Sequence, residues 1–374
     1  MILNKWLIGL LSGTLAASAM AQAPADTAVK VTFGGFVDGY YAWDAGRPPS
    51  MDRSFAGGAL FTTQPARHNE FNVNLAFIEL KAEGARVHGR LALQTGTSVQ
   101  SNYSGEPTNG TVSGPSLGRI IQEAVAGTRI GTNLWVDGGI FFSHMGMESF
   151  ISRDNAAYTR SLAADYSPYY QSGVKFTWTP SSTVTAQVDI VNGWQNISEN
   201  NSGKGVGARI DWALAEGSTL SYYNLLSDES GSQPRAFNGV GAKVVRGAWT
   251  LMGEADAGSQ AHASASTSTS TSTWYGLMAL ARRQVTPTVA LVGRVERFAD
   301  DDQVVMSTGK VGGRANPPFH GNGASVGIDV APSPRALWRT EMRGFGNRDA
   351  IFPNGTAAAR ATDGFVVTSL AVTF

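Results

Sequence analysis

The 374-residue sequence contains no cysteine and little charge. The absence of cysteine excludes disulfides, thiolate metal sites, cysteine nucleophiles and a lipid anchor on an N-terminal cysteine. Charged residues make up 16% of the chain, whereas ordinary soluble domains carry about a quarter. Lysine and arginine together number 29, as do aspartate and glutamate. With no net basic charge to attract phosphates, we expect no nucleic-acid partner.

Long hydrophobic runs are also missing. The longest apolar stretch, residues 6–17, is shorter than the ~20 residues of a membrane-spanning helix. It follows Lys5 and precedes Ala19-Met20-Ala21, which is the order of a secretory signal peptide. The sequence therefore predicts a signal peptide over 1–21, cleaved after Ala21, and export of residues 22–374. An uncleaved N-terminal anchor is the weaker alternative.

What the sequence does contain is a recurring block of alternating apolar and polar residues. Val184, Ala186, Val188 and Ile190, for example, are separated by single polar residues. This period of two places successive side chains on opposite faces of a β-strand. Sixteen strands are expected, at residues 31–44, 70–83, 87–96, 119–129, 134–143, 169–179, 184–192, 205–214, 219–226, 237–246, 248–257, 274–283, 288–298, 323–331, 336–345 and 364–374.

The connections between these strands alternate strictly between short and long. An even number of strands with short turns at one end and long loops at the other is typical of an outer-membrane barrel. A soluble sandwich has no reason to keep its long loops at one end. The fold class expected is therefore all-β, a transmembrane antiparallel barrel of about 16 strands with short periplasmic turns and long extracellular loops. In strand 70–83 the apolar parity switches between Phe77 and Ile78, which favours a β-bulge over a subunit contact.

The tryptophans and the last strand support this interpretation. Trp135, Trp178, Trp212, Trp249 and Trp338 lie beside short turns, and Trp43 and Trp274 lie at long-loop ends, as in an interfacial aromatic girdle. Trp135 is the misfit, because its parity with Asp137 points it inward. The terminal strand places Val366, Thr368, Leu370, Val372 and Phe374 on one face. A strand ending at Phe374 resembles the signal that the barrel assembly machinery reads, which predicts that machinery as a partner.

Several segments resemble the OmpL-like family of β-barrel porins. They include residues 35–44 (GFVDGYYAWD), 69–80 (NEFNVNLAFIEL), 89–103, 148–162 and 166–180 (YSPYYQSGVKFTWTP), with 191–201 (VNGWQNISENN) continuing the match. The similarity is densest over roughly the first 200 residues. It implies a porin in the cell outer membrane of a Gram-negative envelope, and it supplies no substrate and no substrate-binding residue.

Function is expected in the lumen, because sixteen strands enclose water whereas about eight leave an interior filled by side chains. We expect passive diffusion of small hydrophilic solutes and ions through it. Alternation directs several charged side chains inward, and charge facing lipid would cost ~2–4 kcal/mol. The pore-lining and selectivity candidates are Arg90, Lys175, Arg209, Asp211, Arg294, Glu296, Arg339, Glu341 and Arg343. For any single residue, generic wetting of the interior is the simpler interpretation.

The third long loop, residues 144–168, is the one stretch with helical spacing, through Phe150/Ile151, Tyr158 and Leu162. In strand number the chain looks like the general porins, which fold this loop into the lumen, and we expect the same here. An external cap is the alternative. The constriction candidates in the loop are Glu148, Arg153, Asp154, Arg160 and Asp165.

Other functional classes fit less well. No nucleophile elbow, zinc-protease motif or phosphate-binding loop occurs, and four of the five histidines lie in loops or at loop edges, so we expect no enzyme. No cofactor and no metal site are expected. An occluded or substrate-specific channel, and an adhesin or structural barrel without an open pore, remain as alternatives. Outer-membrane lipid, lipopolysaccharide and two further copies of the chain, in a homotrimer, are the remaining expected partners.

Overall fold

The computed structural model describes residues 28–229, 233–261 and 271–374. Residues 1–21, the expected signal peptide, lie outside this part of the chain. The first half of the barrel is formed by β1 (Lys30–Asp44), β2 (Phe71–Glu83), β3 (Val87–Thr95), β4 (Ile121–Gly131), β5 (Leu134–Phe142), β6 (Tyr170–Ser181), β7 (Val184–Val191) and β8 (Gly205–Ala215). The second half is formed by β9 (Ser218–Asp228), β10 (Pro234–Arg246), β11 (Trp249–Ala261), β12 (Thr271–Gln284), β13 (Val289–Asp300), β16 (Phe319–Ser333), β17 (Ala336–Asn347) and β18 (Thr362–Thr373).

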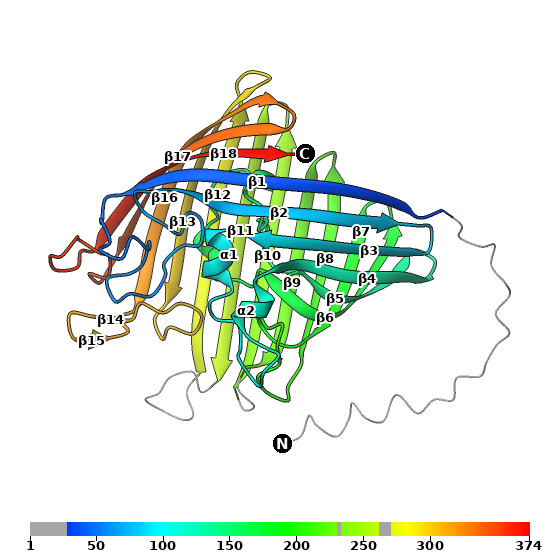
Figure 1. Ribbon diagram of the computed structural model, residues 1–374, viewed down its shortest axis with the longest axis horizontal. Coiled ribbons are helices and arrows are strands. Elements are labelled where there is room, and N and C mark those ends of the chain that lie inside the picture. The colour runs from blue at the N-terminus through cyan, green and yellow to red at the C-terminus, as the bar shows by residue number, and fades with distance from the viewer. Residues whose placement is uncertain (1–27, 230–232, 262–270) are drawn as a thin grey trace.

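These sixteen strands form one closed antiparallel barrel (Figure 1). Each pairs with its neighbour in sequence, and β18 closes the barrel by pairing with β1, with Phe36 opposite Thr373 and Asp44 opposite Phe365. The predicted fold class is confirmed, and each strand lies within a few residues of its expected position. The alternating pattern is sufficient because one face of every strand meets lipid and the other meets the lumen.

The connections contain a little further structure. The loop between β13 and β16 carries a hairpin of β14 (Lys310–Val311) and β15 (Arg314–Ala315). The loop between β3 and β4 carries the short helices α1 (Thr97–Asn102) and α2 (Pro115–Gly118). The helical spacing in the third long loop overstates its helix content, because only a 3₁₀ turn at Ser152–Asp154 and α3 (Leu162–Asp165) form there.

In the described part of the chain no helix is long and apolar enough to cross a membrane.

The bulge expected in β2 is present but lies nearer the start of the strand than the parity switch. Between β1 and β2, Asp38 pairs with Leu75 and the next pair joins Gly39 to Val73, so Asn74 is the extra residue. Asn74 and Leu75 are both buried, whereas further along Phe77 faces inward and Ile78 is exposed. The extra residue thus restores the alternation that directs Phe77 into the barrel.

Five of the tryptophans follow the girdle pattern. Trp43, Trp178, Trp212, Trp249 and Trp338 are exposed on the outer wall. The placement of Trp274 in the girdle is wrong: its ring is buried in the lumen beside Phe237 and Trp194. Its position at a strand end did not reveal which face it occupies. Trp135 does point inward and stacks on His88 with ring centroids 4.4 Å apart.

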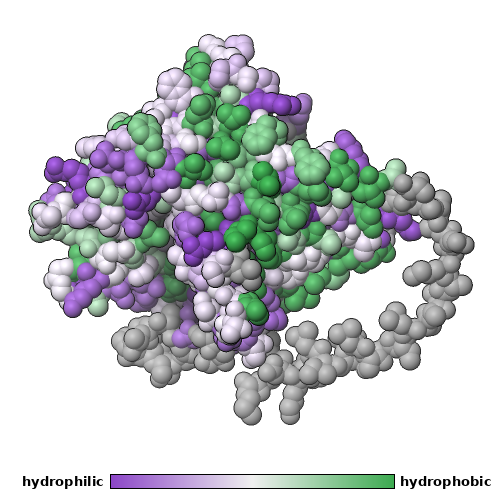
Figure 2. Space-filling view, in the orientation of Figure 1, coloured by the Kyte–Doolittle hydropathy of each residue, from purple (hydrophilic) through white to green (hydrophobic). Residues whose placement is uncertain are grey.

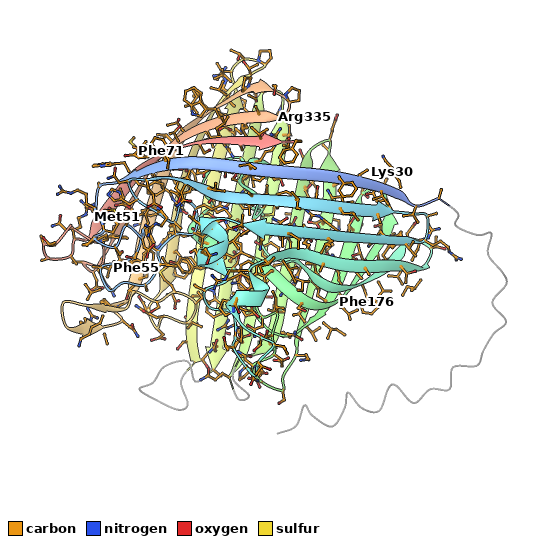
Figure 3. The ribbon with its side chains drawn as sticks, viewed as in Figure 1. Lys30, Met51, Phe55, Phe71, Phe176 and Arg335 are labelled. Atoms are coloured by element: carbon orange, nitrogen blue, oxygen red, sulfur yellow. The ribbon has the colours of Figure 1, made fainter. Side chains whose placement is uncertain are left out.

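The two ends of the barrel differ in what covers them. Figure 3 labels Lys30 at the end with short turns, and Met51 and Phe55 among the long loops at the opposite end. In Figure 2, hydrophilic surface gathers over these loops and hydrophobic surface over the strands. Inside the long-loop end, aromatic side chains of the loops and strands form the largest apolar cluster, in which Phe61 contacts Phe345 at 4.6 Å between ring centroids.

Candidate functional site

The third long loop makes hydrogen bonds to the inner face of the barrel. Thr159 donates from its backbone nitrogen and its hydroxyl to the carboxylate of Glu341 on β17, at 2.8 and 2.9 Å. The backbone nitrogen of Leu162 donates to Glu296 on β13 at 2.6 Å. Because these carboxylates belong to inward-facing strand positions, the loop lies against the lumen wall.

Three inward arginines bind the same loop. Arg294 donates to the carbonyl oxygen of Thr159 at 2.6 Å, and Arg339 to the carbonyl oxygen of Ser152 at 2.8 Å. Arg343 donates to the hydroxyl oxygen of Thr159 at 3.3 Å and to Glu296 on β13 at 2.6 Å, and the three arginine side chains are at most 2% exposed. A guanidinium has five donors in a fixed planar fork, so it can bind a carboxylate and backbone carbonyls together.

We call these five residues, Arg294, Glu296, Arg339, Glu341 and Arg343, the clamped wall. All were singled out in the sequence as candidates for lining the pore. The structure places them on the inner face but beneath the third long loop, where the solvent does not reach them.

The loop runs along much of the lumen. Near its start, Arg209 on β8 donates to the carbonyl oxygens of His144 and Gly146, at 2.8 and 2.9 Å. Further on, Arg153 donates to the carbonyl oxygen of Pro334, in the short turn between β16 and β17. The loop is therefore held both against the middle of β8 and at the short-turn end of the barrel, which fixes its path through the interior.

The opposite side of the lumen remains exposed. Lys81, Arg90, Lys175, Arg209 and Asp211 have side chains that are 20 to 41% exposed, and we call this set the open wall. Arg90 pairs with Glu79 at 2.7 Å, and Arg209 pairs with Asp211 at 2.8 Å. The wall is thus predominantly cationic, and its two arginines are paired with carboxylates.

A cavity of about 410 Å³ lies at the short-turn end of the open wall. Its lining includes Lys81, Arg90 and Lys175 from the open wall, together with the stacked rings of His88 and Trp135. Asp137 lies between His88, which it contacts closely, and Lys175, 3.8 Å away. The sequence reasoning placed Arg90 and Lys175 inward but did not anticipate this aromatic pair, although the parity of Trp135 contained the signal.

The five loop candidates separate into two groups. Glu148, Arg160 and Asp165 are buried, and Glu148 accepts a hydrogen bond from the backbone nitrogen of Ser161 at 2.8 Å. Arg153 is half-buried and Asp154 is exposed. Of the five candidates, only Arg153 and Asp154 place a charged group where solvent reaches the loop.

Burial changes the proton affinity of the charged pair within the loop. Arg160 and Asp165 are 3.2 Å apart, and the guanidinium lies 3.4 Å from the ring centroid of Tyr169. Removal from water raises the pKa of Asp165 and lowers the pKa of Arg160 to about 10, because each charged form loses hydration. The two remain a complementary pair within the loop.

Two further anchors of the loop, Asp38 and Glu254, were not among the pore-lining or constriction candidates. Ser152 donates to Asp38 on β1 at 2.7 Å, and the backbone nitrogen of Met147 donates to Glu254 on β11 at 3.1 Å. Both acidic residues stand at inward positions of alternating strands, which was the available signal. Within the described residues, no three histidine, aspartate or glutamate side chains are placed to hold a metal ion.

Comparison with solved structures places the fold among outer-membrane channels. The channel DcaP of Acinetobacter baumannii aligns over 94% of this chain and 99% of its own, with 14% identity and a TM-score of 0.59. OmpF of Salmonella typhi, solved with daunomycin, aligns over 92% and 98%, with 12% identity and a TM-score of 0.59. OmpT of Vibrio cholerae, in a trimer form, aligns over 93% and 100%, with 9% identity and a TM-score of 0.56.

No curated protein matches the sequence. A family model does: the model described as "Putative beta-barrel porin-2, OmpL-like" matches residues 30–374, which is the whole barrel. The match extends well beyond the first 200 residues on which the resemblance was densest. The chain therefore belongs to the OmpL-like β-barrel porin-2 family, and it is an outer-membrane porin.

Proposed function

We propose that this porin passes small hydrophilic solutes and ions by diffusion along the open wall, with the third long loop as a fixed constriction. The observation that carries the proposal is the unequal burial of the two walls. Solvent reaches the charges of the open wall, whereas the loop covers those of the clamped wall. Charges that line the water-filled path act directly on a passing ion, whereas the buried charges of the clamped wall are largely neutralised by one another.

The open-wall residues Arg90, Lys175, Arg209 and Asp211 are the proposed selectivity determinants. Arg153 and Asp154 join them as the accessible charges of the constriction. For Glu148, Arg160, Asp165 and the clamped wall we propose a different role, which is to hold the loop in place. Their contacts with one another leave no surface for a solute.

The cellular setting follows from the family and the sequence. Residues 1–21 are the proposed signal peptide, removed after Ala21. Lipopolysaccharide, outer-membrane lipid and the barrel assembly machinery, acting on the strand that ends at Phe374, are the proposed partners. A homotrimer is proposed by likeness to the trimer form of OmpT. We propose that the protein is a channel and not an enzyme.

An occluded or substrate-specific channel is the second candidate. It is favoured by the apolar cluster at the long-loop end, where Phe55 and Phe61 from one loop pack against Phe352 from another. Packed aromatic side chains in the lumen exclude water and narrow the path for ions.

Single-channel recording from the purified protein in a planar bilayer tests both candidates. Large, stepwise conductance in neutral salt supports an open diffusion pore, and the reversal potential in a salt gradient gives the sign of the selectivity. A folded, heat-modifiable barrel that conducts no ions would overturn the open pore in favour of the occluded channel.

A further inference from the structure

One arginine of strand β13 faces the membrane instead of the lumen. Arg297 lies between Glu296 and Phe298, which are both buried, and Val295 on its own face of the strand is 61% exposed. A charge on the lipid face is costly at the middle of the bilayer and tolerated near its edge. Arg297 is three residues from the long-loop end of β13 and contacts Tyr275, a residue type that gathers at membrane interfaces. The guanidinium is therefore placed near the lipid headgroups of the outer leaflet.

Three uncharged groups hold this guanidinium in place. Nε of Arg297 donates to the hydroxyl oxygen of Tyr275 and Nη1 donates to Oδ1 of Asn322, each at 3.0 Å. The hydrogen bond to Asn322 lies at the exposed surface of the barrel. Nη2 contacts Nε2 of His320, which is the acceptor because a guanidinium only donates. The side chain is thus fixed in one orientation on the outer wall.

The charge of Arg297 has no anionic partner in the described part of the chain. No Asp or Glu oxygen there lies within 4.0 Å of its guanidinium. Asp301 lies on the other side of His320, 3.5 Å from Nδ1, and is also 4.0 Å from Arg348. Of the five N–H donors of Arg297 three are used, so one remains on each terminal nitrogen. A fixed guanidinium with these two donors free can bind a phosphate through two parallel hydrogen bonds.

Two apolar grooves of the outer wall adjoin at this arginine. The first, of about 580 Å³, extends from Arg297 across β13, β12, β11, β10 and β9. It is hollow because small residues lie between larger ones: Ala255, for example, pairs with Val240 on one side and Leu277 on the other. The second groove, of about 460 Å³, extends over β16, β17, β18 and β1, and is lined by Ala324, Val326, Met342, Gly344, Val366 and Trp43 among others.

The register of β13 and β16 shows where the grooves meet. Val295 of the first groove pairs directly with Ala324 of the second, and the next outward pair towards the long loops joins Arg297 to Asn322. A molecule with its head at Arg297 can therefore place one chain in each groove. The two grooves favour an amphiphile with several chains on one head over an amphiphile with a single chain.

The head group determines which amphiphile binds. Hydrocarbon chains gain little from moving between lipid and an apolar groove, because both surroundings are apolar. The grooves therefore provide fit, and the contact of Arg297 with an anionic head provides the discrimination. In the outer leaflet of a Gram-negative membrane, the phosphorylated and multiply acylated anchor of lipopolysaccharide has this chemistry.

We propose that the outer wall around Arg297 is a binding site for one lipopolysaccharide molecule, with a phosphate of its lipid anchor on Arg297 and acyl chains in the two grooves. The inference goes beyond the channel function, and it rests on the proposed cellular setting only for the supply of lipopolysaccharide. It gives one side of the barrel a specific lipid contact.

The test uses the full mature protein, folded in detergent, with the purified phosphorylated lipid anchor of lipopolysaccharide as the probe. Native mass spectrometry during a titration is expected to show one anchor bound per chain in a saturable manner. The dephosphorylated anchor loses the charge-assisted hydrogen bonds to Arg297 and is expected to bind at least about tenfold more weakly. Phosphatidylglycerol, which carries a phosphate and two chains, is also expected to bind more weakly.

Substitutions on the lipid face separate the head from the chains. Arg297→Gln is expected to weaken binding at least about tenfold, because the phosphate loses its cation. Ala279→Phe fills the first groove without changing any charge and is expected to weaken binding severalfold. Arg283→Gln is the matched control: Arg283 is exposed on β12 at the short-turn end, over the ring of Trp249, and its loss should leave binding unchanged. Heat-modifiable migration on gels checks that each variant folds.

Several outcomes would overturn the inference. They are equal binding of the phosphorylated and dephosphorylated anchors, equal binding by wild type and Arg297→Gln, and an equal loss in Arg283→Gln, which would indicate attraction by diffuse charge. Phosphatidylglycerol binding as tightly as the anchor, in a way that depends on Arg297, would assign the site to phospholipid instead. Single-channel conductance of the same preparations tests the channel separately. A barrel that binds the anchor and conducts nothing keeps the lipid site and loses the open pore.

Discussion

The clamped wall and the open wall carry the same kinds of side chain in opposite surroundings. Arg343 and Glu296 are paired at 2.6 Å and have no exposure, whereas Arg209 and Asp211 are paired at 2.8 Å and keep a fifth or more of their surface in solvent. The strand pattern is the same in both cases. The difference is how far the third long loop covers the pair. Arg209 contacts the start of the loop, at the carbonyl oxygens of His144 and Gly146, and still remains exposed to solvent, whereas the loop covers Arg343 and Glu296 completely.

Burial also changes what each pair contributes. A buried pair has lost its hydration and depends on its partners, so removing one partner leaves an unpaired charge at a cost of about 3–5 kcal/mol. An exposed pair is hydrated and screened, and contributes ~0–1 kcal/mol. The two walls should therefore respond differently to the same substitution.

The largest difference is expected from replacing an arginine on each wall by leucine. Arg294→Leu should release the third long loop, because Glu341 loses its arginine partner at a cost of about 3–5 kcal/mol and the carbonyl oxygen of Thr159 loses its donor. Single-channel conductance should rise, and amides of residues 159–165 should exchange faster with deuterium. Arg90→Leu on the open wall is the matched control and should alter ion selectivity without releasing the loop. Equal conductance in the two variants would contradict the assignment of the walls.

Cysteine labelling is expected to show the next largest difference. The chain has no cysteine of its own, so a thiol reagent reacts only with the introduced residue. Ser325 faces the clamped wall between Arg294 and Arg343 and is 5% exposed. Thr177 lies on β6, two residues beyond Lys175 on the same inward face. Ser325→Cys should react with a charged thiol reagent over a hundredfold more slowly than Thr177→Cys, because the loop must first open against about 3 kcal/mol. Similar rates would show that the loop leaves the wall readily.

Ion selectivity should change by a smaller factor. A unit charge about 5 Å from a passing ion is worth ~0.8 kcal/mol in water, so reversing one charge changes the occupancy of a cation, or of an anion in the opposite sense, by up to about fifteenfold. Lys175→Glu should therefore shift the reversal potential towards cations. Lys204→Glu in the loop 192–204 makes the same change outside the open wall and should shift it much less. A shift of equal size in both variants would place the selectivity outside the open wall.

Glu106 lies outside both walls, so its titration reports the effect of burial alone. Of the four tests, this one should give the smallest change. Burial raises the pKa of Glu106, although it accepts hydrogen bonds from Tyr170 and from the backbone nitrogens of Ile197 and Ser198. A raised pKa in the packed state means that packing is favoured as the pH falls through it, by at most about tenfold per pH unit. Amide exchange at Ser198, corrected for its intrinsic pH dependence, should slow accordingly, and Glu106→Gln should remove this dependence. Faster exchange at lower pH in the wild type would reverse the sign.

The sequence predicted the barrel well because alternation is a local property. Strand β7 was expected at 184–192 and is found at Val184–Val191, and the inward parity of Trp135 was also correct. Trp274 was misplaced because residues 274–281 are apolar or small on both faces of the strand, so alternation does not distinguish the lumen face from the lipid face there. The local pattern therefore identifies the faces of a strand only where one of them is polar.

The candidate site was less predictable, since its character depends on contacts distant in sequence. Alternation predicted that Arg294 and Arg339 face inward, but not that a loop covers them. The residues that cover them, Ser152 and Thr159, are small and neutral and carry no motif. A cavity of about 250 Å³ among the long loops is lined by five connections, at 60–63, 101–102, 165–169, 194–195 and 305, none of which has a signature of its own.

The anchors of the third long loop also bear on how the protein folds. Thr159 binds Glu341, 182 residues further along the chain, and Ser152 binds Arg339, 187 residues further on. These contacts cannot form until the last strands have been added, and contacts so distant in sequence form slowly. The loop should therefore reach its final position only after nearly all of the barrel has been built. The pore would acquire its final width late in the maturation of the protein.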